Sequence, residues 1–188
     1  MKPWLLNILA CPIDKHHPLE AHFFTWETAQ EELRKAAEEA GRPSSAFDRS
    51  YRQLTKQLKD GTISPAAMRA IEDLTGSDDS AGLLEGAVEA VGRLERSLDM
   101  TGRELLRDFA GEIDRLHRFL NLLEVDAGLL VCSECGRWYP VGSSVEAIPE
   151  LLPDELRDRD RDIAWLERWR ELMPPSVLED GKPFNLGG

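Results

Sequence analysis

The sequence predicts an α+β fold: a small β module, split by a large all-helical insertion and followed by a C-terminal helix. An aromatic, strand-like segment occurs at residues 19–26, and comparable segments return only after residue 128. Between them, strong helix formers alternate with apolar residues at helical spacing. We therefore assign the chain as follows: a discontinuous β domain at 1–26 and 127–156, a helical insertion at 27–126, and a C-terminal helix and tail at 157–188.

The N-terminal part of the β module contains a short helix and a strand. Residues 2–9 predict the helix, because Pro3 suits a first helical turn and Trp4 and Leu5 begin an apolar pattern at helical spacing. Residues 19–26, "LEAHFFTW", are aromatic and alternate well enough to predict a strand.

The insertion predicts several amphipathic helices separated by polar breaks. Ser64 followed by Pro65 is a strong start signal, since serine caps a helix and proline suits its first position. Glycine after a helical pattern marks the helix ends. The expected helices are 27–41, 47–59, 64–74, 83–98 and 103–123.

After Gly128 the chain predicts strand, tight turn and strand, with the strands at residues 129–131 and 138–141. Residues 153–173 then return to a helical pattern. Trp165 and Trp169, four residues apart on one face of that helix, are expected to pack against the helical insertion.

The composition excludes some classes of protein. Of 188 residues, 41% are hydrophobic and 31% charged, which is typical of a globular chain rather than a disordered one. The net charge is −12, whereas a surface that binds nucleic acid needs clustered Lys and Arg. We therefore expect contact with nucleic acid only indirectly, through a partner.

The cysteines and the apolar segments indicate the compartment. Three cysteines, two of them as CxxC, do not form a secreted disulfide framework. The N-terminal segment lacks the features of a signal peptide, and no segment approaches the roughly 18 apolar residues of a membrane span. We expect a cytoplasmic protein that does not associate with a membrane.

The segment "CSECG" has the spacing of a zinc knuckle. Cys132 and Cys135 can face one ion, and the glycine that follows can adopt the positive φ of a tight turn. Cys11, followed by a proline, resembles the first half of a matching knuckle. Because a structural zinc site needs four ligands, a fourth must be found.

Three residues after Cys11 are candidates for the fourth ligand. Asp14 has the register of a second knuckle ligand, His16 lies within the usual spacing, and His17 is one residue beyond it. The alternative is that no metal binds, that the thiols are simply buried, and that Asp14 caps a turn.

Taken together, "MKPWLLNILACPIDK", "CSECGRWYPV" and "IPELLPDELR" resemble the zinc-ribbon activator subunits of methyltransferases, the multifunctional methyltransferase subunit family. The resemblance covers about residues 1–26 and 127–156, and the tail is similar to an extension in archaeal-type members. It implies a zinc ribbon-like β domain whose usual ligands align with Cys11, Cys132 and Cys135. The remaining family cysteine falls at or near Asp14 or His16.

The resemblance also implies a function without catalysis. Family members bind a class I SAM-dependent methyltransferase, cover its apolar surface and activate it, and the substrates of the complexes include tRNA, rRNA and a translation release factor. We therefore expect neither catalytic residues nor an organic cofactor in this chain.

Strand addition to an open sheet edge would explain such an activation. The expected contact patch is "VEAIPELLP", and the alternative is that its apolar residues fold back onto the chain's own core. An exposed apolar strand also predicts a homodimer when the partner is absent. The expected partner-binding residues are Trp4, Leu5, Trp138, Tyr139, Ile148, Leu151 and Leu152.

Two further functions remain open at this point. One is a zinc ribbon that binds nucleic acid directly, which the acidic composition disfavours. The other is a thiol enzyme that uses Cys132, although a thioredoxin-like CxxC opens a helix and strand residues follow this one.

Overall fold

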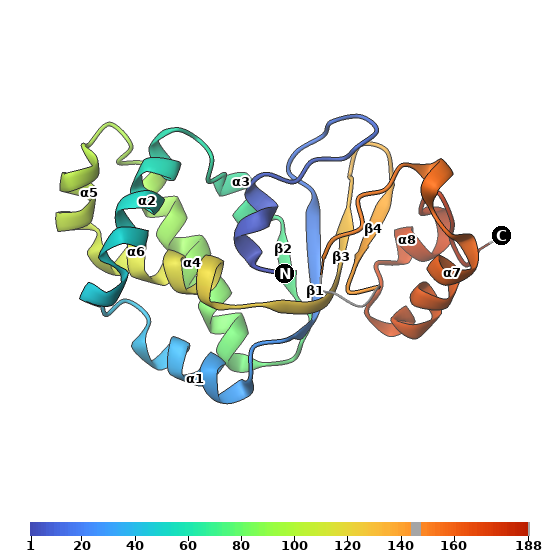
Figure 1. Cartoon of the computed structure of the whole chain (residues 1–188), viewed down its shortest axis with the longest axis horizontal. Helices are drawn as coiled ribbons and strands as arrows, with labels where there is room; N and C mark the ends of the chain where they lie inside the picture. The colour runs from blue at the N-terminus through green and yellow to red at the C-terminus, as the bar shows by residue number, and fades with distance from the viewer. Residues whose placement is uncertain (144–147, 188) are drawn as a thin grey trace.

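The computed structural model describes residues 1–143 and 148–187. Figure 1 shows three layers: a block of helices, a central sheet and a C-terminal segment on the far side of the sheet. The predicted α+β class is confirmed.

The central sheet joins strands that lie far apart in the sequence. Its strand order is β2-β1-β3-β4, in which β1 pairs antiparallel with β3, β3 pairs antiparallel with β4, and β2 pairs parallel with β1. The strands are β1 (Glu20–Trp26), β2 (Ile71–Asp73), β3 (Val125–Val131) and β4 (Trp138–Val141).

The insertion is not entirely helical, contrary to the sequence-based expectation. The helix predicted at 64–74 ends at Arg69, and β2 follows it, with Ile71 opposite Ala21 of β1. Pairing with a neighbouring strand here overrides the weak helix preference of a short segment.

Strand β3 begins at Val125, earlier than the predicted 129. Its Gly128 lies opposite Phe23, and a Cβ atom at this position would come within 2.7 Å of the carbonyl oxygen of His22. Gly128 is therefore a strand residue that permits a close backbone approach, rather than the end of a turn.

The helical block, all of it within the described residues, contains six α-helices, a π-helical turn and two 3-10 turns. The helix predicted at 103–123 is interrupted at Phe109, whose backbone leaves the helical region at φ −126° and ψ 30°. In the part of the chain that the structure describes, no helix is long and apolar enough to span a membrane. The elements are η1 (Pro3–Asn7), α1 (Gln30–Glu39), η2 (Ser45–Phe47), α2 (Asp48–Lys59), α3 (Pro65–Arg69), α4 (Asp78–Glu95), α5 (Gly102–Asp108), α6 (Ala110–His117) and η3 (Arg118–Leu122).

One face of the sheet and the helical block share a single hydrophobic core. Phe23 of β1 and Leu130 of β3 belong to the same buried cluster as Leu116 of α6 and Leu94 of α4. This core therefore crosses the expected domain boundaries. The division into a split β domain and a separate helical domain stays a prediction.

The C-terminal segment covers the opposite face of the sheet with a second core. Phe24 of β1 lies 5.9 Å from Trp165 and 5.2 Å from Trp169, and the ring of Trp138 stacks on Trp165 at 5.8 Å. The expectation that the two tail tryptophans contact the helical insertion is wrong, because strand alternation directs Phe24 away from the helices. The segment comprises η4 (Asp154–Leu156), α7 (Arg159–Arg168), η5 (Arg170–Leu172) and α8 (Pro175–Asp180).

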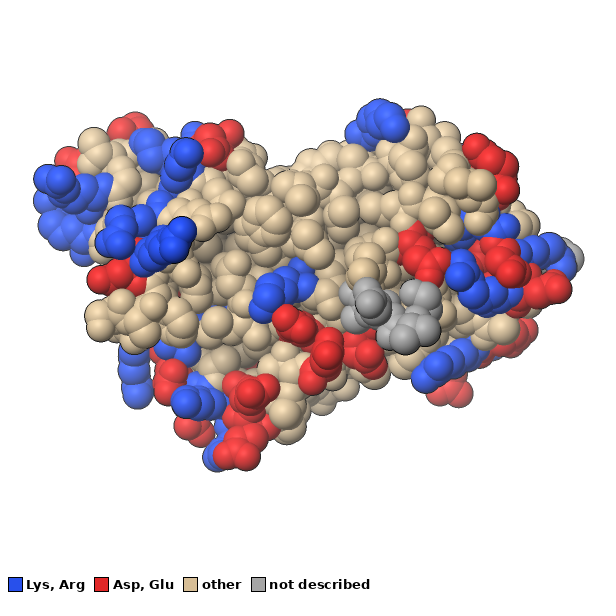
Figure 2. All heavy atoms as spheres, viewed as in Figure 1, with Lys and Arg blue, Asp and Glu red and all other residues tan. Residues whose placement is uncertain are grey.

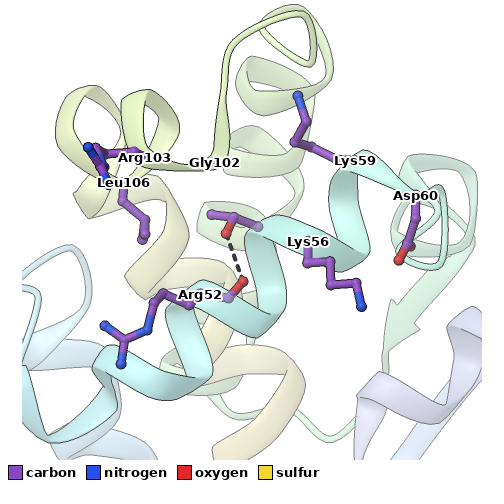
Figure 3. Close-up of a pocket in the computed structure, with 8 residues that line it drawn as sticks. Arg52, Lys56, Lys59, Asp60, Gly102, Arg103 and Leu106 are labelled. Carbon is purple, nitrogen blue, oxygen red and sulfur yellow. Dashed lines mark hydrogen bonds between the residues drawn. The ribbon is translucent and has the colours of Figure 1, made fainter.

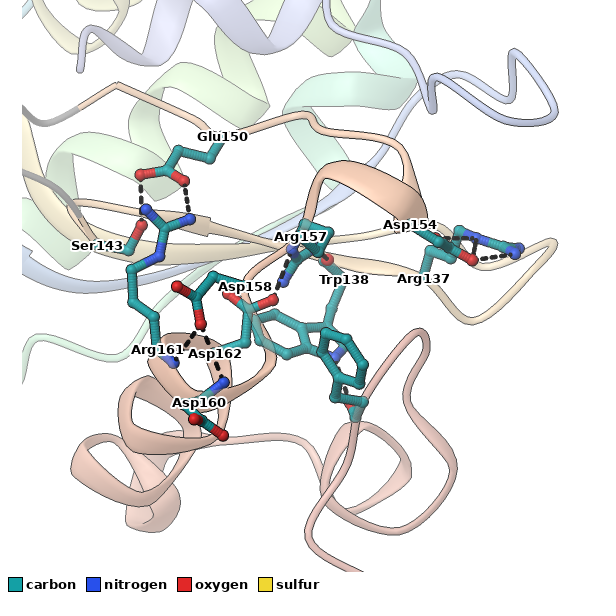
Figure 4. Close-up of polar contacts among 11 residues, drawn as sticks. Arg137, Trp138, Ser143, Glu150, Asp154, Arg157, Asp158, Asp160, Arg161 and Asp162 are labelled. Carbon is teal, nitrogen blue, oxygen red and sulfur yellow. Dashed lines mark hydrogen bonds and ion pairs between the residues drawn. The ribbon is translucent and has the colours of Figure 1, made fainter.

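A buried ion pair fastens the start of this segment to the sheet (Figure 4). Arg157 donates to Asp162 at 2.7 Å and to the carbonyl oxygen of Trp138 at 2.7 Å, and its guanidinium lies 4.5 Å from the centre of the Trp138 ring. The side chains of Arg157 and Asp162 are 1% and 0% exposed. Each buried charge is therefore compensated by the other, and removal of one would leave an unpaired charge in the interior.

We predict that Asp162→Ala lowers the free energy of unfolding by about 3–5 kcal/mol, because it leaves the buried charge of Arg157 unpaired. Urea denaturation of the full chain measures this change. The matched double variant Arg157→Met with Asp162→Leu removes both charges and should be clearly less destabilised. Equal losses in the single and double variants would contradict this role of the pair.

Candidate metal centre

The first cysteine loop is a tight backbone turn at residues 11–16. The amide of Cys11 donates to the carbonyl oxygen of His16 at 3.0 Å, and the amide of Lys15 donates to the carbonyl oxygen of Cys11 at 3.0 Å. Lys15 has φ 64°, the left-handed conformation that such a turn requires. Asp14 lies at the apex, three residues after the cysteine.

The second loop, at residues 132–137, repeats the same hydrogen-bond pattern. The amide of Cys132 donates to the carbonyl oxygen of Arg137 at 2.8 Å, and the amide of Gly136 donates to that of Cys132 at 2.9 Å. Gly136 has φ 71° at the position that corresponds to the lysine of the first loop. Asp14 therefore occupies the place that Cys135 holds in the second loop.

The two loops bring four side chains into one cluster. The ligand atoms of Cys11, Asp14, Cys132 and Cys135 all lie within 4.8 Å of one another. The Sγ atoms of Cys11 and Cys135 are 3.8 Å apart, and Sγ of Cys132 lies 3.4 and 3.6 Å from the two Asp14 oxygens. Tetrahedral zinc, with Zn–S about 2.3 Å and Zn–O about 2.1 Å, requires about 3.8 Å between sulfurs and about 3.6 Å between sulfur and oxygen. The cluster therefore fits zinc.

The cluster combines a neutral thiol with a charged carboxylate. Burial raises the pKa of Cys132 to about 12. The backbone amide of His16, 2.9 Å from Oδ1 of Asp14, holds the pKa of that carboxyl well below its usual range, and the cysteine thiols add to this effect. A metal that binds here must displace thiol protons, whereas Asp14 is already ionised.

The histidines near the first loop have other partners. Nε2 of His16 lies 3.1 Å from the hydroxyl oxygen of Ser133, and Nδ1 of His17 lies 2.9 Å from the carbonyl oxygen of Leu9. Of the residues considered for the fourth ligand, the geometry places Asp14 in the cluster and both histidines outside it. Nothing in the sequence indicates the contact between His16 and Ser133.

Trp138 and Tyr139 are buried, with exposed fractions of 0% and 1%. The hydroxyl of Tyr139 lies 3.2 Å from Sγ of Cys11, beneath the cluster, and burial raises its pKa. Nε1 of Trp138 donates to the carbonyl oxygen of Phe184 at 2.8 Å. The expectation that these two side chains contact a partner is corrected, because both support the interior of the fold.

The other residues expected to bind a partner are more accessible. Trp4 and Leu5 of η1 and Leu151 are half-buried against the main core, Leu152 is also half-buried, and Ile148 is 55% exposed. Residues 145–147 of the expected contact patch lie outside the described residues.

Residues 148–152 run along the β4 edge of the sheet. Pro149 forms an antiparallel bridge with Val141 of β4, and the amide of Glu150 donates to the carbonyl oxygen of Pro140 at 3.0 Å. Figure 2 shows that the upper middle of this face is largely uncharged, with basic and acidic side chains below it and at both ends.

Comparison with known proteins identifies a family. No curated protein and no solved structure gives a match to the chain. The model of the family described as "Trm112p-like protein" matches residues 2–142, a range that includes all four strands and both cysteine loops. The chain therefore belongs to the Trm112p-like family, whose members are non-catalytic activator subunits of methyltransferases.

Proposed function

We propose that this chain binds, stabilises and activates a class I SAM-dependent methyltransferase by covering an apolar surface of the enzyme. The family match across the sheet and both cysteine loops carries the proposal. From the resemblance, the substrate of the complex would be tRNA, rRNA or a translation factor. The cytoplasm remains the expected compartment.

A largely uncharged surface in the middle of the molecule supports this proposal (Figures 1 and 2). It is defined here as the central face and contains η1 and residues 148–152, of which Glu150 is paired with Arg161. Ile8, just after η1, is 54% exposed, and Ile148 is 55% exposed. Large apolar side chains exposed on a chain with 31% charged residues indicate an interaction site.

The partner strand would add beside residues 148–152. Strand β4 itself is already paired on its outer side, because the amide of Trp138 donates to the carbonyl oxygen of Lys182 at 3.1 Å and Pro140 accepts from Glu150. The opposite edge, β2, has three residues and carries Glu72 and Asp73, and short acidic edges disfavour strand addition. The same central face would support a homodimer in the absence of the enzyme.

We also propose that Cys11, Asp14, Cys132 and Cys135 hold a structural zinc ion. Two ligands come from each loop, so the metal would cross-link the two halves of the sheet module, which lie far apart in the sequence. Four protein ligands close the coordination sphere and favour a structural rather than a catalytic role.

The alternatives lack comparable support. A reactive cysteine needs a lowered pKa, whereas burial raises that of Cys132. Direct contact of the cysteine loops with nucleic acid needs unpaired basic side chains. Lys15 instead donates to the carbonyl oxygen of Pro12 at 2.7 Å, and Arg137 forms an ion pair with Asp154 at 2.8 Å.

We predict that the wild-type chain, saturated with zinc and then desalted, retains about one zinc ion. Asp14→Ala should lose most of it, because the carboxylate is the fourth ligand, whereas His16→Ala should retain it. Inductively coupled plasma mass spectrometry measures the content, and Asp14→Cys should restore binding. Loss of zinc in His16→Ala alone would move the fourth ligand to the histidine, and a wild-type chain without zinc would refute the site.

We predict that the tagged chain recovers a SAM-fold methyltransferase in stoichiometric amount from native extract, as identified by mass spectrometry. Ile148→Asp should weaken the recovered complex by about 10- to 100-fold, because a buried isoleucine contributes about 1.5–3 kcal/mol. Titration of the purified pair measures this change.

Ala46→Asp is the matched control, because it places the same charge at an exposed alanine of the helical block. It should leave the affinity unchanged, and circular dichroism should show both variants folded. Equal affinities for Ile148→Asp and the wild type would remove residue 148 from the interface. Recovery of no methyltransferase would refute the proposed function.

A further inference from the structure

Helix α2 carries a row of basic side chains on one face. Arg49, Arg52, Lys56 and Lys59 follow one another at spacings of three, four and three residues, and all are exposed. Such spacings place side chains on the same side of a helix. The helix has a single acidic residue, Asp48, although the whole chain has a net charge of −12. This local concentration of positive charge is opposite in sign to the rest of the molecule.

A groove of about 700 Å³ opens beside this row, between α2 and α5 (Figure 3). Arg52 and Lys56 project from α2, and Arg103 and Leu106 project from α5 on the other side. Thr55, Gly102, Lys59 and one acidic residue, Asp60, also line it. The groove therefore has a cationic rim on both sides and an apolar contribution from Leu106. We name this feature the basic groove.

The cations of the basic groove are available for a ligand. Within residues 1–143 and 148–187, no ion pair is formed by Arg52, Lys56 or Arg103. Lys59 differs, because it donates to the carbonyl oxygens of Leu98, at 2.9 Å, and of Met100. It therefore anchors the loop before α5 rather than facing a ligand.

We propose that the basic groove binds the phosphate backbone of a single-stranded nucleic acid. At about 1.5 Å rise per residue, the row from Arg49 to Lys56 extends about 10 Å and places a positive charge about every 5 Å. A row of this length matches a polymer with regularly repeated negative charge. The guanidinium groups of Arg52 and Arg103 suit bidentate contact with phosphate, and Leu106 offers an apolar surface to a sugar or base.

This inference does not depend on the proposed function but is compatible with it. The basic groove lies at the α2 and α5 end of the molecule, where Figure 2 shows basic side chains gathered, and away from the central face. An enzyme bound to the central face would leave the groove open. The chain would then add its own contact to a nucleic acid held by the complex.

The test uses a short fluorescein-labelled single-stranded oligouridylate and the full chain, with fluorescence anisotropy measured over a series of salt concentrations. The triple variant Arg52→Gln, Lys56→Gln, Arg103→Gln removes three cations that line the groove without an ion pair, and it keeps Lys59. The control variant Arg34→Gln, Lys35→Gln, Arg159→Gln changes the net charge by the same amount at exposed positions elsewhere.

Each phosphate contact contributes about −0.7 to the slope of log affinity against log salt. The triple variant should flatten the slope by about 2 and weaken binding on the order of 100-fold at 0.1 M salt, whereas the control variant should change little. Equal effects of the two variants, or no binding by the wild type, would overturn the proposal. So would an acidic peptide, polyglutamate, that competes as well as the oligouridylate. Capture of the methyltransferase is measured separately, so failure of this inference leaves the proposed function untouched.

Discussion

The antiparallel pairing of β1 with β3 is the interaction on which the rest of the molecule depends. It runs from Glu20 opposite Val131 to Trp26 opposite Val125, although residues 27–124 separate the two strands. The first cysteine loop comes directly before β1, and the second comes directly after β3. The antiparallel register therefore brings both loops to the same end of the sheet and creates the four-residue cluster. The entropy of closing such a long connection grows only slowly with its length, so the helical block can be large without preventing the pairing.

The same pairing creates a sheet with two apolar faces, and a different part of the chain buries each face. Phe23 and Phe24, adjacent in β1, point to opposite faces, where the helical block and the C-terminal segment bury them. The C-terminal segment is held in place by the ion pair of Arg157 and Asp162 as well as by aromatic stacking. Since Arg157 also donates to the carbonyl oxygen of Trp138, the C-terminal segment is fixed to β4 and not only to the apolar surface.

The sequence predicted well those features that local pattern determines, and less well those that depend on distant pairing. The cysteine spacing indicated both loops, but only the folded structure shows that Asp14 lies in the cluster and His16 outside it. Strand β2 has too few residues to show the alternation of apolar and polar side chains that marks a strand. It is recognised only from its pairing with β1. Because the sheet is buried on both faces, alternation along "RWYPV" could not show that Trp138 and Tyr139 are interior.

Net charge is a coarse guide to binding, because it averages over surfaces that a ligand meets separately. The Debye length at physiological salt is about 8 Å, so a ligand at α2 responds mainly to nearby side chains and little to acidic residues across the molecule. Arg52, Lys56 and Arg103 therefore present a local positive field on a chain of net charge −12. The central face and the basic groove lie on different parts of the molecule. If both proposals hold, the chain would bind an enzyme with one surface while the other remains free for a polyanion.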